Sequence, residues 1–465
     1  MPRILNRLKR PSSTDPPSAQ PSSSLHERMA LLRHLLHHPP SPDRWQRLCE
    51  LFTHWPTAER DALHIATDYA RQHLAQHAWP DALRTAPITW WSDVRRGLTP
   101  PYWSLARLLD LSACLGFGAD AVRELAAAPP IASLTQLSLN HRVIHAIGAR
   151  ALANSPHLSQ LTHLMLHQCH IGPNGARALA DSPHLTRLTH LNLSHNHIGP
   201  SGVQALARSP LMAQLTTLSL AELPASFSPS PMGPEGLQAL IGAVHRQLTH
   251  LNIAHNGLGG EDIAHLAASP IDSLIHLDLH GNPMGLAGAR ALADSPHLSR
   301  LTHLNLGQTD LNSGGLAALA GSPNLSQLTH LVLRHNPLRL AAIRALADSP
   351  HLTRLTHLDL SQIPLPPEAV QALANSPYLS RLTHLDLSGS LVGPRGCAAL
   401  SQLNAPLQTL HLDRTMPGQT GLHQLARKAP WLNTVRTLSL AENALSDDAI
   451  VALARTPHLD RLTRL

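Results

Sequence analysis

The sequence is poor in aromatic residues, charge and cysteine, and each shortage narrows what the chain can be. Phe, Trp and Tyr make up only 3% of the 465 residues, so a large core has to be built from aliphatic side chains. The four cysteines are scattered, without a CxxC pair, at Cys49, Cys114, Cys169 and Cys397. This usage argues against a disulfide framework or a zinc site, and it indicates a reducing compartment such as the cytoplasm.

Charge and long apolar runs are also scarce. Charged residues account for 14% of the chain, and the formal net charge of +6 is not gathered into a basic stripe, so we expect no nucleic-acid binding. No stretch of 18 apolar residues is present, so we expect no membrane-spanning helix. The first residues lack the apolar region of a secretory signal. Residues 1–24 are basic and rich in Pro and Ser, which predicts a disordered tail.

A repeated tetrapeptide is what the chain has in abundance. LTHL occurs seven times, mostly 27 residues apart, starting at residues 161, 188, 248, 301, 328, 355 and 382. A fixed period of roughly 20–50 residues is the signature of a solenoid, in which each unit needs its neighbours to bury its apolar face. We therefore expect residues 106–465 to form about 12–13 stacked repeats.

Each repeat, which reads LTHLxLxxNxIGxxGxxALAxSPHLxxL, divides into two halves. The stretch LxxLxL alternates apolar and polar residues as a strand does, whereas GxxALA spaces its apolar residues as a helix does. The Ser-Pro pair ends the helix, because the residue before proline is pushed out of the α region. We predict an α/β solenoid with an inner parallel sheet and outer helices. Because a helix is wider than a strand, the stack should curve into a horseshoe.

Residues 25–105 follow a different pattern. Apolar residues recur at three- and four-residue spacing in 25–38, 43–55 and 57–79, which predicts helices. Six of the seven tryptophans lie in this region, at Trp45, Trp55, Trp79, Trp90, Trp91 and Trp103. We expect a small helical cap or companion domain before the repeats.

The pattern LxxLxLxxN/CxL resembles the leucine-rich repeat, and the long helical half resembles its ribonuclease-inhibitor subtype. The ninth column of the repeat carries the residue types with which that family holds the turn after the strand: Asn196, Asn256, Asn282, Asn336, Asn443, Cys114 and Cys169. The segment WWSDVRRGL (90–98) resembles the lead-in of bacterial leucine-rich repeat proteins with an N-terminal companion domain. The resemblance implies a non-enzymatic role in protein–protein interaction.

The asparagine column is interrupted. The same position is occupied by Arg142, Leu223, Thr309, Ile363, Ser390 and Thr415. Leu223 and Ile363 cannot hydrogen-bond a turn through their side chains, so we expect local irregularity at these two positions.

A column of histidines is the main candidate site. The two leucines of LTHL point into the core, so the residue between them points outward on the concave face. This third column holds His163, His190, His250, His276, His303, His330, His357 and His384. Repeat duplication could have copied a tolerated surface residue. The column could instead contact a partner, bind a transition metal or respond to pH. No cofactor is expected.

The fifth column also faces the concave side and varies between repeats. Its acidic members are Asp278, Asp359 and Asp386, each beside a histidine of the third column. We interpret these three residues as a polar contact patch for a partner, with a plain solvated strand face as the alternative. The histidines of the SPHL segments lie in the return loops, where we expect them to face water or cap carbonyl groups.

The sequence contains no catalytic motif such as GxSxG, GxxxxGK[ST] or HExxH, so we expect no enzyme. The preferred function is a cytoplasmic scaffold that binds a protein partner through the concave face. The alternative is a secreted bacterial effector whose tail serves export. The sequence ends at LTRL, part-way into a further unit without a polar cap, so we expect a truncated chain or a covering subunit.

Overall fold

The computed structural model describes residues 24–224, 231–243, 247–447, 451 and 462–463. The predicted tail therefore lies outside the described residues, apart from Ser24. The chain divides into two compact units. The first takes in the described residues up to Ile144 together with Ala151–Met165 and Ser182–Arg187, and the second takes in His145–Arg150, Leu166–Asp181 and the described residues from Leu188 onward. This division does not coincide with the boundary that we predict near residue 105, which stays a prediction.

The first unit begins with the expected helices and continues into the first strands. Its elements are α1 (Leu25–His37), α2 (Pro42–Thr53), α3 (Arg60–Gln76), α4 (Ile88–Arg95), β1 (Leu108–Asp110), α5 (Ala119–Ala126), β2 (Gln136–Ser138) and β3 (His163–Met165). Strands β1, β2 and β3 pair in parallel and in order. Helix α6 (His145–Ala153) has residues in both units.

Aromatic side chains form much of the core of the helical region. All six tryptophans of residues 25–105 are buried, and Trp90 is completely covered. The Trp90 ring lies 4.5 Å from the Tyr102 ring and 5.8 Å from the Trp103 ring, measured between centroids. The three- and four-residue periodicity predicts the helices of this region. Their large aromatic side chains then fill the core between these short helices.

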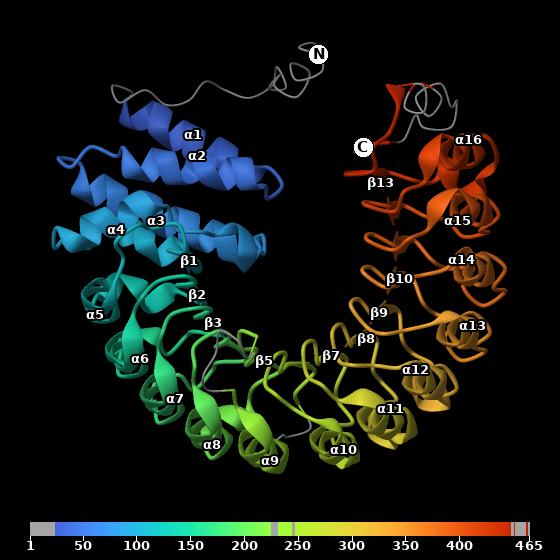
Figure 1. Cartoon of the computed structure of the whole chain (residues 1–465). Coiled ribbons are helices and arrows are strands. Elements are labelled where there is room, and N and C mark those ends of the chain that lie inside the picture. The colour runs from blue at the N-terminus through green and yellow to red at the C-terminus, as the bar shows by residue number, and fades with distance from the viewer. Residues whose placement is uncertain (1–23, 225–230, 244–246, 448–450, 452–461, 464–465) are drawn as a thin grey trace. The chain divides into compact units, whose positions relative to one another are not determined.

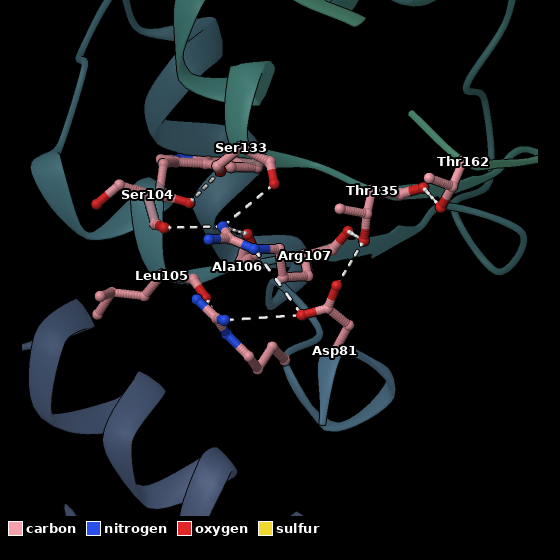
Figure 2. Close-up of polar contacts among 10 residues, drawn as sticks. Asp81, Ser104, Leu105, Ala106, Arg107, Ser133, Thr135 and Thr162 are labelled. Carbon is pink, nitrogen blue, oxygen red and sulfur yellow. Dashed lines mark hydrogen bonds and ion pairs between the residues drawn. The ribbon is translucent and has the colours of Figure 1, made fainter. Parts of the chain in front are cut away.

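A short segment between α3 and α4 pairs with the edge of β1 through a parallel bridge between Thr85 and Leu108. Figure 2 shows Asp81 of this segment beside Arg107. The carbonyl oxygen of Arg84 accepts hydrogen bonds from the amides of Arg107 and Leu108. Strands of the repeats are bonded to the strand before them in the same way. Arg84 is 6% exposed, and its Nε donates to the carbonyl oxygen of Leu105 at 2.8 Å. Asp81 lies 3.7 Å from Arg84 and 3.9 Å from Arg107. The helical region thus supplies a first rung for the sheet and removes an open edge.

The second unit consists of repeated strand–helix pairs. Its strands are β4 (His190–Asn192), β5 (Thr217–Ser219), β6 (His250–Asn252), β7 (His276–Asp278), β8 (His303–Asn305), β9 (His330–Val332), β10 (His357–Asp359), β11 (His384–Asp386), β12 (Thr409–His411) and β13 (Thr437–Ser439). Its helices are α7 (Gly172–Ala180), α8 (Gly199–Ala207), α9 (Gly233–Ala243), α10 (Gly260–Ala268), α11 (Gly285–Asp294), α12 (Ser313–Ala320), α13 (Leu340–Ala347), α14 (Pro367–Ala374), α15 (Gly393–Leu400) and α16 (Gly418–Lys428).

The strands of this unit are parallel, and neighbours in the sheet are neighbours in the sequence. The strands line the inner side of the unit and the helices its outer side (Figure 1). In each strand the middle leucine is buried and the residues on either side are half-buried. The sheet is open rather than closed, so the prediction of an α/β solenoid with inner strands and outer helices is confirmed.

Polar side chains join each repeat to the next. In the second unit, Asn282 accepts from the amides of Asn256 and Leu258 and donates to the carbonyl oxygens of Ile253 and Leu279. Asn196, Asn256, Asn336 and Asn443 make equivalent bonds to the turns after their strands. Cys169 is buried, and its backbone amide donates to Asn196. Cys114, in the first unit, is half-buried, and its carbonyl oxygen accepts from Arg142.

The two positions at which we expect irregularity behave differently. At Leu223 the neighbouring Glu222 is buried, with 2% of its surface exposed, and it lies 3.5 Å from His197. Burial raises the pKa of Glu222 to about 7, although the backbone amides of Asn196, His197 and Ile198 lower it in part. At Ile363 the side chain is simply buried, and β10 keeps its register with both neighbouring strands.

The serines of the Ser-Pro pairs, apart from Ser269, which bonds to its own helix, have a second role that periodicity does not reveal. Ser209 donates its hydroxyl proton to the carbonyl oxygen of Ala180, at the end of the preceding helix, and Ser349 donates to Ala320 in the same way. These carbonyl groups have no partner inside their own helix. The serine therefore caps the preceding repeat's helix, in addition to standing where its own helix ends.

Candidate functional site

Six of the predicted histidines stand side by side on consecutive strands of the second unit. We call them the histidine row: His250, His276, His303, His330, His357 and His384, from β6 to β11. Their ring centroids are 3.7–3.9 Å apart throughout. His190, on β4, is separated from the row by Thr217 on β5. His163 lies on β3 in the first unit. We call the side of the sheet that carries the row the strand face.

In five members of the row, the threonine before the histidine positions the ring. In the LTHL repeats of the row, the threonine hydroxyl donates to a carbonyl oxygen of the preceding repeat at 3.0–3.2 Å. The same hydroxyl lies 2.7–2.9 Å from Nδ1 of the following histidine. A hydroxyl has one proton to give, and the carbonyl oxygen can only accept. With the hydroxyl proton on the carbonyl oxygen, this network assigns the proton of the neutral ring to Nδ1 and leaves Nε2 with a lone pair.

One member of the row shows what the threonine does. His276 follows Ile275 instead of a threonine. Its ring is turned by 71° against that of His250 and by 84° against that of His303. The four rings from His303 to His384 all follow threonine, and they stack with angles of 13–17° between neighbours. The residue in the second column of the repeat thus orients the histidine ring in the third column.

The row is held in the uncharged state. Burial first, and repulsion from neighbouring histidines second, lower the pKa of His276, His303 and His357 to about 4. Burial also lowers the pKa of His250, His330 and His384 below the ordinary value for histidine. At neutral pH the row is therefore a strip of neutral rings. Within the described residues no Nε2 of the row has a hydrogen-bond partner from the strands, so these lone pairs are available as acceptors.

The aspartates of the fifth column hydrogen-bond the turn after their strand, which the sequence interpretation did not predict. Asp359 Oδ1 accepts from the amide of Ser361 at 2.9 Å, and Asp386 Oδ1 accepts from that of Ser388 at 2.8 Å. Asp278 binds the amide of His280 in the same way. Such a bond to the amide two residues on is the turn that Asn and Asp favour, so it explains why these two residue types recur at the strand end.

The structure brings together only two members of the predicted acidic patch. Asp359 and Asp386 are partners on the adjacent strands β10 and β11. Asp278 is on β7, and β8 and β9 stand between it and Asp359. The three residues therefore do not form one patch.

His411 joins the acidic pair and was not among the predicted site residues. Its Nδ1 lies 3.3 Å from Asp386 Oδ2, with 38% of the His411 side chain and 30% of the Asp386 side chain exposed. The hydrogen bond that His411 donates to Asp386 raises the pKa of His411, against the effect of burial. Burial raises the pKa of Asp386, but its bonds to His411 and Ser388 outweigh this and lower the pKa overall. His411 stands in LQTLHL, where LTHL is lost, so the tetrapeptide could not reveal it.

A hollow of about 270 Å³ opens on the strand face between β9 and β12. It is lined by the third-column residues His330, His357 and His384 and by the fifth-column residues Val332, Asp359, Asp386 and His411.

The geometry does not favour the metal-binding alternative. Lone pairs on stacked rings run side by side, whereas ligands of a metal ion have to converge on one point. In the part of the chain that the structure describes, no group of three or more His, Cys, Asp or Glu side chains is arranged to hold a metal ion. Among the same residues, no helix is both long enough and apolar enough to cross a membrane.

Comparisons with known proteins address the repeats. A family model described as "Leucine Rich repeat" matches residues 157–180, 184–207, 244–267, 273–293, 297–320 and 432–454. A search of curated proteins gives no match.

Two solved structures are similar to the chain. One is an internalin from Listeria monocytogenes, at 18% identity over 74% of this chain and 93% of the internalin, with a TM-score of 0.42. The other belongs to the complex of Rad7 and Elc1 in yeast, at 17% identity over 90% of this chain and 96% of that one, with a TM-score of 0.51. The second likeness supports the fold alone. With its repeats matched by the family model and seen as stacked strand–helix units, this chain is a leucine-rich repeat protein.

Proposed function

We propose that the chain is a non-enzymatic scaffold that binds a protein partner through the strand face of its second unit. The observation that carries the proposal is the histidine row. The fold does not require histidine in the third column, because Thr217, Thr409 and Thr437 occupy the same position in strands of the same geometry. Six consecutive repeats nevertheless keep histidine there, with touching rings and free acceptors.

A row of this kind is well prepared for binding. The threonines already restrict the rings, so little side-chain freedom is lost when a partner arrives. The rings are neutral, so their desolvation costs far less than that of charged groups. The solved chain of the Rad7 and Elc1 complex, which shares the fold, comes from a protein assembly, and we expect this chain to act in an assembly too.

The test replaces part of the row and measures partner capture. We expect His303→Thr, His330→Thr and His357→Thr together to leave folding intact, because threonine is native to this column, and to weaken capture of the partner from a lysate about tenfold or more. The matched control replaces three loop histidines, His157, His184 and His351, by threonine. Equal capture by the wild type and the row variant would refute the proposal.

We further propose that the protein acts in the cytoplasm. The four cysteines support this, because all are free and three of them are buried. The alternative is a secreted bacterial effector, in which residues 1–24 serve export and the repeats recruit a host target. Deleting residues 1–24 separates the two proposals, since loss of secretion is expected only for the effector. Similarity to the ribonuclease-inhibitor subtype and to bacterial companion-domain proteins remains part of this proposal.

A further inference from the structure

The hollow between β9 and β12 offers hydrogen-bond acceptors on two facing sides. On one side stand the Nε2 lone pairs of His330, His357 and His384, because the preceding threonines hold the protons on Nδ1. On the other side stands Asp359, whose Oδ1 is taken by the amide of Ser361 while Oδ2 has no partner among the described residues. A ligand that fits here has to be rich in donors.

The hollow is also negatively charged. Asp359 and Asp386 line it, and no lysine or arginine is among its lining residues. The carboxylate of Asp413 also acts on His411 and accepts from the hydroxyl of Ser439. Two nearby arginines are turned to other partners, since Arg334 reaches toward His280 and Arg414 binds Glu442. The hollow would therefore repel an anionic ligand. It would attract a cationic ligand, because these two arginines of the chain bind elsewhere.

The shape selects among cations. The third and fifth residues of a strand lie about 7 Å apart on one face, so the two acceptor sides leave room for a flat group that donates in both directions. A guanidinium group is planar, carries five N–H donors and accepts nothing. An ammonium group is compact and strongly hydrated, and it cannot reach both sides at once with fixed geometry.

We propose that this hollow accepts the arginine side chain of an extended segment of the partner protein, with the guanidinium group between Asp359 and the rings of His330, His357 and His384. This inference rests on the proposed function and specifies the chemistry of the partner. The neighbouring rings of the row, His303 and His276, would contact the residues that flank the arginine.

The test uses small probes and therefore does not depend on the partner's identity. N-acetylarginine amide is titrated into the full chain with labelled histidine rings, and the ring signals are followed by NMR. The citrulline counterpart has nearly the same shape without the charge, and the lysine counterpart has the charge without the fork. We expect saturable shifts of His330, His357 and His384 with arginine, and affinities at least about tenfold weaker with the other two probes.

Matched variants locate the site. Asp359→Asn keeps an oxygen for the amide of Ser361, as Asn305 does natively for Gly307, so the turn should stay intact. We expect this variant to bind arginine at least about tenfold more weakly. Asp278→Asn makes the same change in the same column outside the hollow, and we expect binding as in the wild type.

Several results would overturn the inference. These are no shift with arginine, an equal response to lysine or citrulline, and an equal loss of binding in Asp278→Asn. The proposed function is judged separately, by partner capture with the row variant. Capture that depends on the row without arginine binding would therefore remove this inference and leave the proposed function standing.

Discussion

Acidification is the perturbation that best probes the histidine row. The pKa of His303 and of His357 is about 4 in the folded protein, whereas an unfolded chain titrates histidine near 6.5. Between these two values the unfolded state binds protons that the folded state excludes, so the free energy of unfolding falls as the pH falls. Above pH 6.5 the row is neutral in both states and imposes no penalty.

The size of the effect follows from the pKa values and the exposure of the rings. A fall from 6.5 to about 4 corresponds to roughly 3.4 kcal/mol for each ring if it were fully realised. The rings keep contact with solvent, so we take about a third of this, near 1 kcal/mol per ring. For His303 and His357 together we expect a loss of about 2 kcal/mol between pH 7.5 and pH 4.5, and the lowered pKa of His330 adds to this loss.

The assay compares the wild type with the variant in which these three histidines are threonine. Urea unfolding at pH 7.5 and at pH 4.5 gives the free energy of unfolding of both proteins. The comparison cancels other titrating groups, including Glu222, whose effect has the opposite sign. The wild type should lose at least about 2 kcal/mol more than the variant. Two proteins with the same pH dependence, or ring pKa values near 6.5 by NMR titration, would refute the account of a neutral, repulsive row.

Three further predictions follow from single contacts. Asn282→Ala should lower the free energy of unfolding by about 3 kcal/mol in urea titration, because two amides and two carbonyl groups lose their partner, whereas Ser390→Ala removes a single bond and should cost about 1 kcal/mol. Glu222→Gln should stabilise the protein by about 2 kcal/mol at pH 8 and little at pH 4.5, since the raised pKa makes the wild type lose stability as the pH rises from 4.5 through 7; equal effects at both pH values would contradict this. Ile275→Thr should supply the missing hydroxyl, so that the ring of His276 stacks on that of His303 and long-range nitrogen NMR reports a proton on its Nδ1; an unchanged ring angle in a crystal structure would count against the threonine's role.

The sequence was sufficient for the architecture because the repeat period and the leucine columns are local signals that every unit repeats. Leu304, Leu358 and Leu385 alternate with polar residues, and all three are buried in the middle of their strands. The helices before the repeats could be predicted in the same way from three- and four-residue spacing.

The candidate site was only partly predictable, because it depends on contacts between repeats. The sequence placed His303 and His330 in one column, but not the threonine hydroxyl that fixes each ring. It grouped Asp278 with Asp359 by residue type, whereas two strands separate them in the sheet. It also missed Glu222, which is buried one position before the asparagine column. Each of these features depends on a contact between repeats or on the order of strands in the sheet. The sequence of a single repeat contains neither.

The most direct measurement of the central claim is histidine footprinting of the protein alone and in complex with its captured partner. Diethyl pyrocarbonate modifies the unprotonated ring nitrogen, which the row presents as Nε2, and mass spectrometry locates the modified residues. We predict that binding slows the modification of His303, His330, His357 and His384 at least about fivefold, while the loop histidines His157 and His351 react as before. Equal modification of the row in the free and bound protein would contradict a partner site on the strand face.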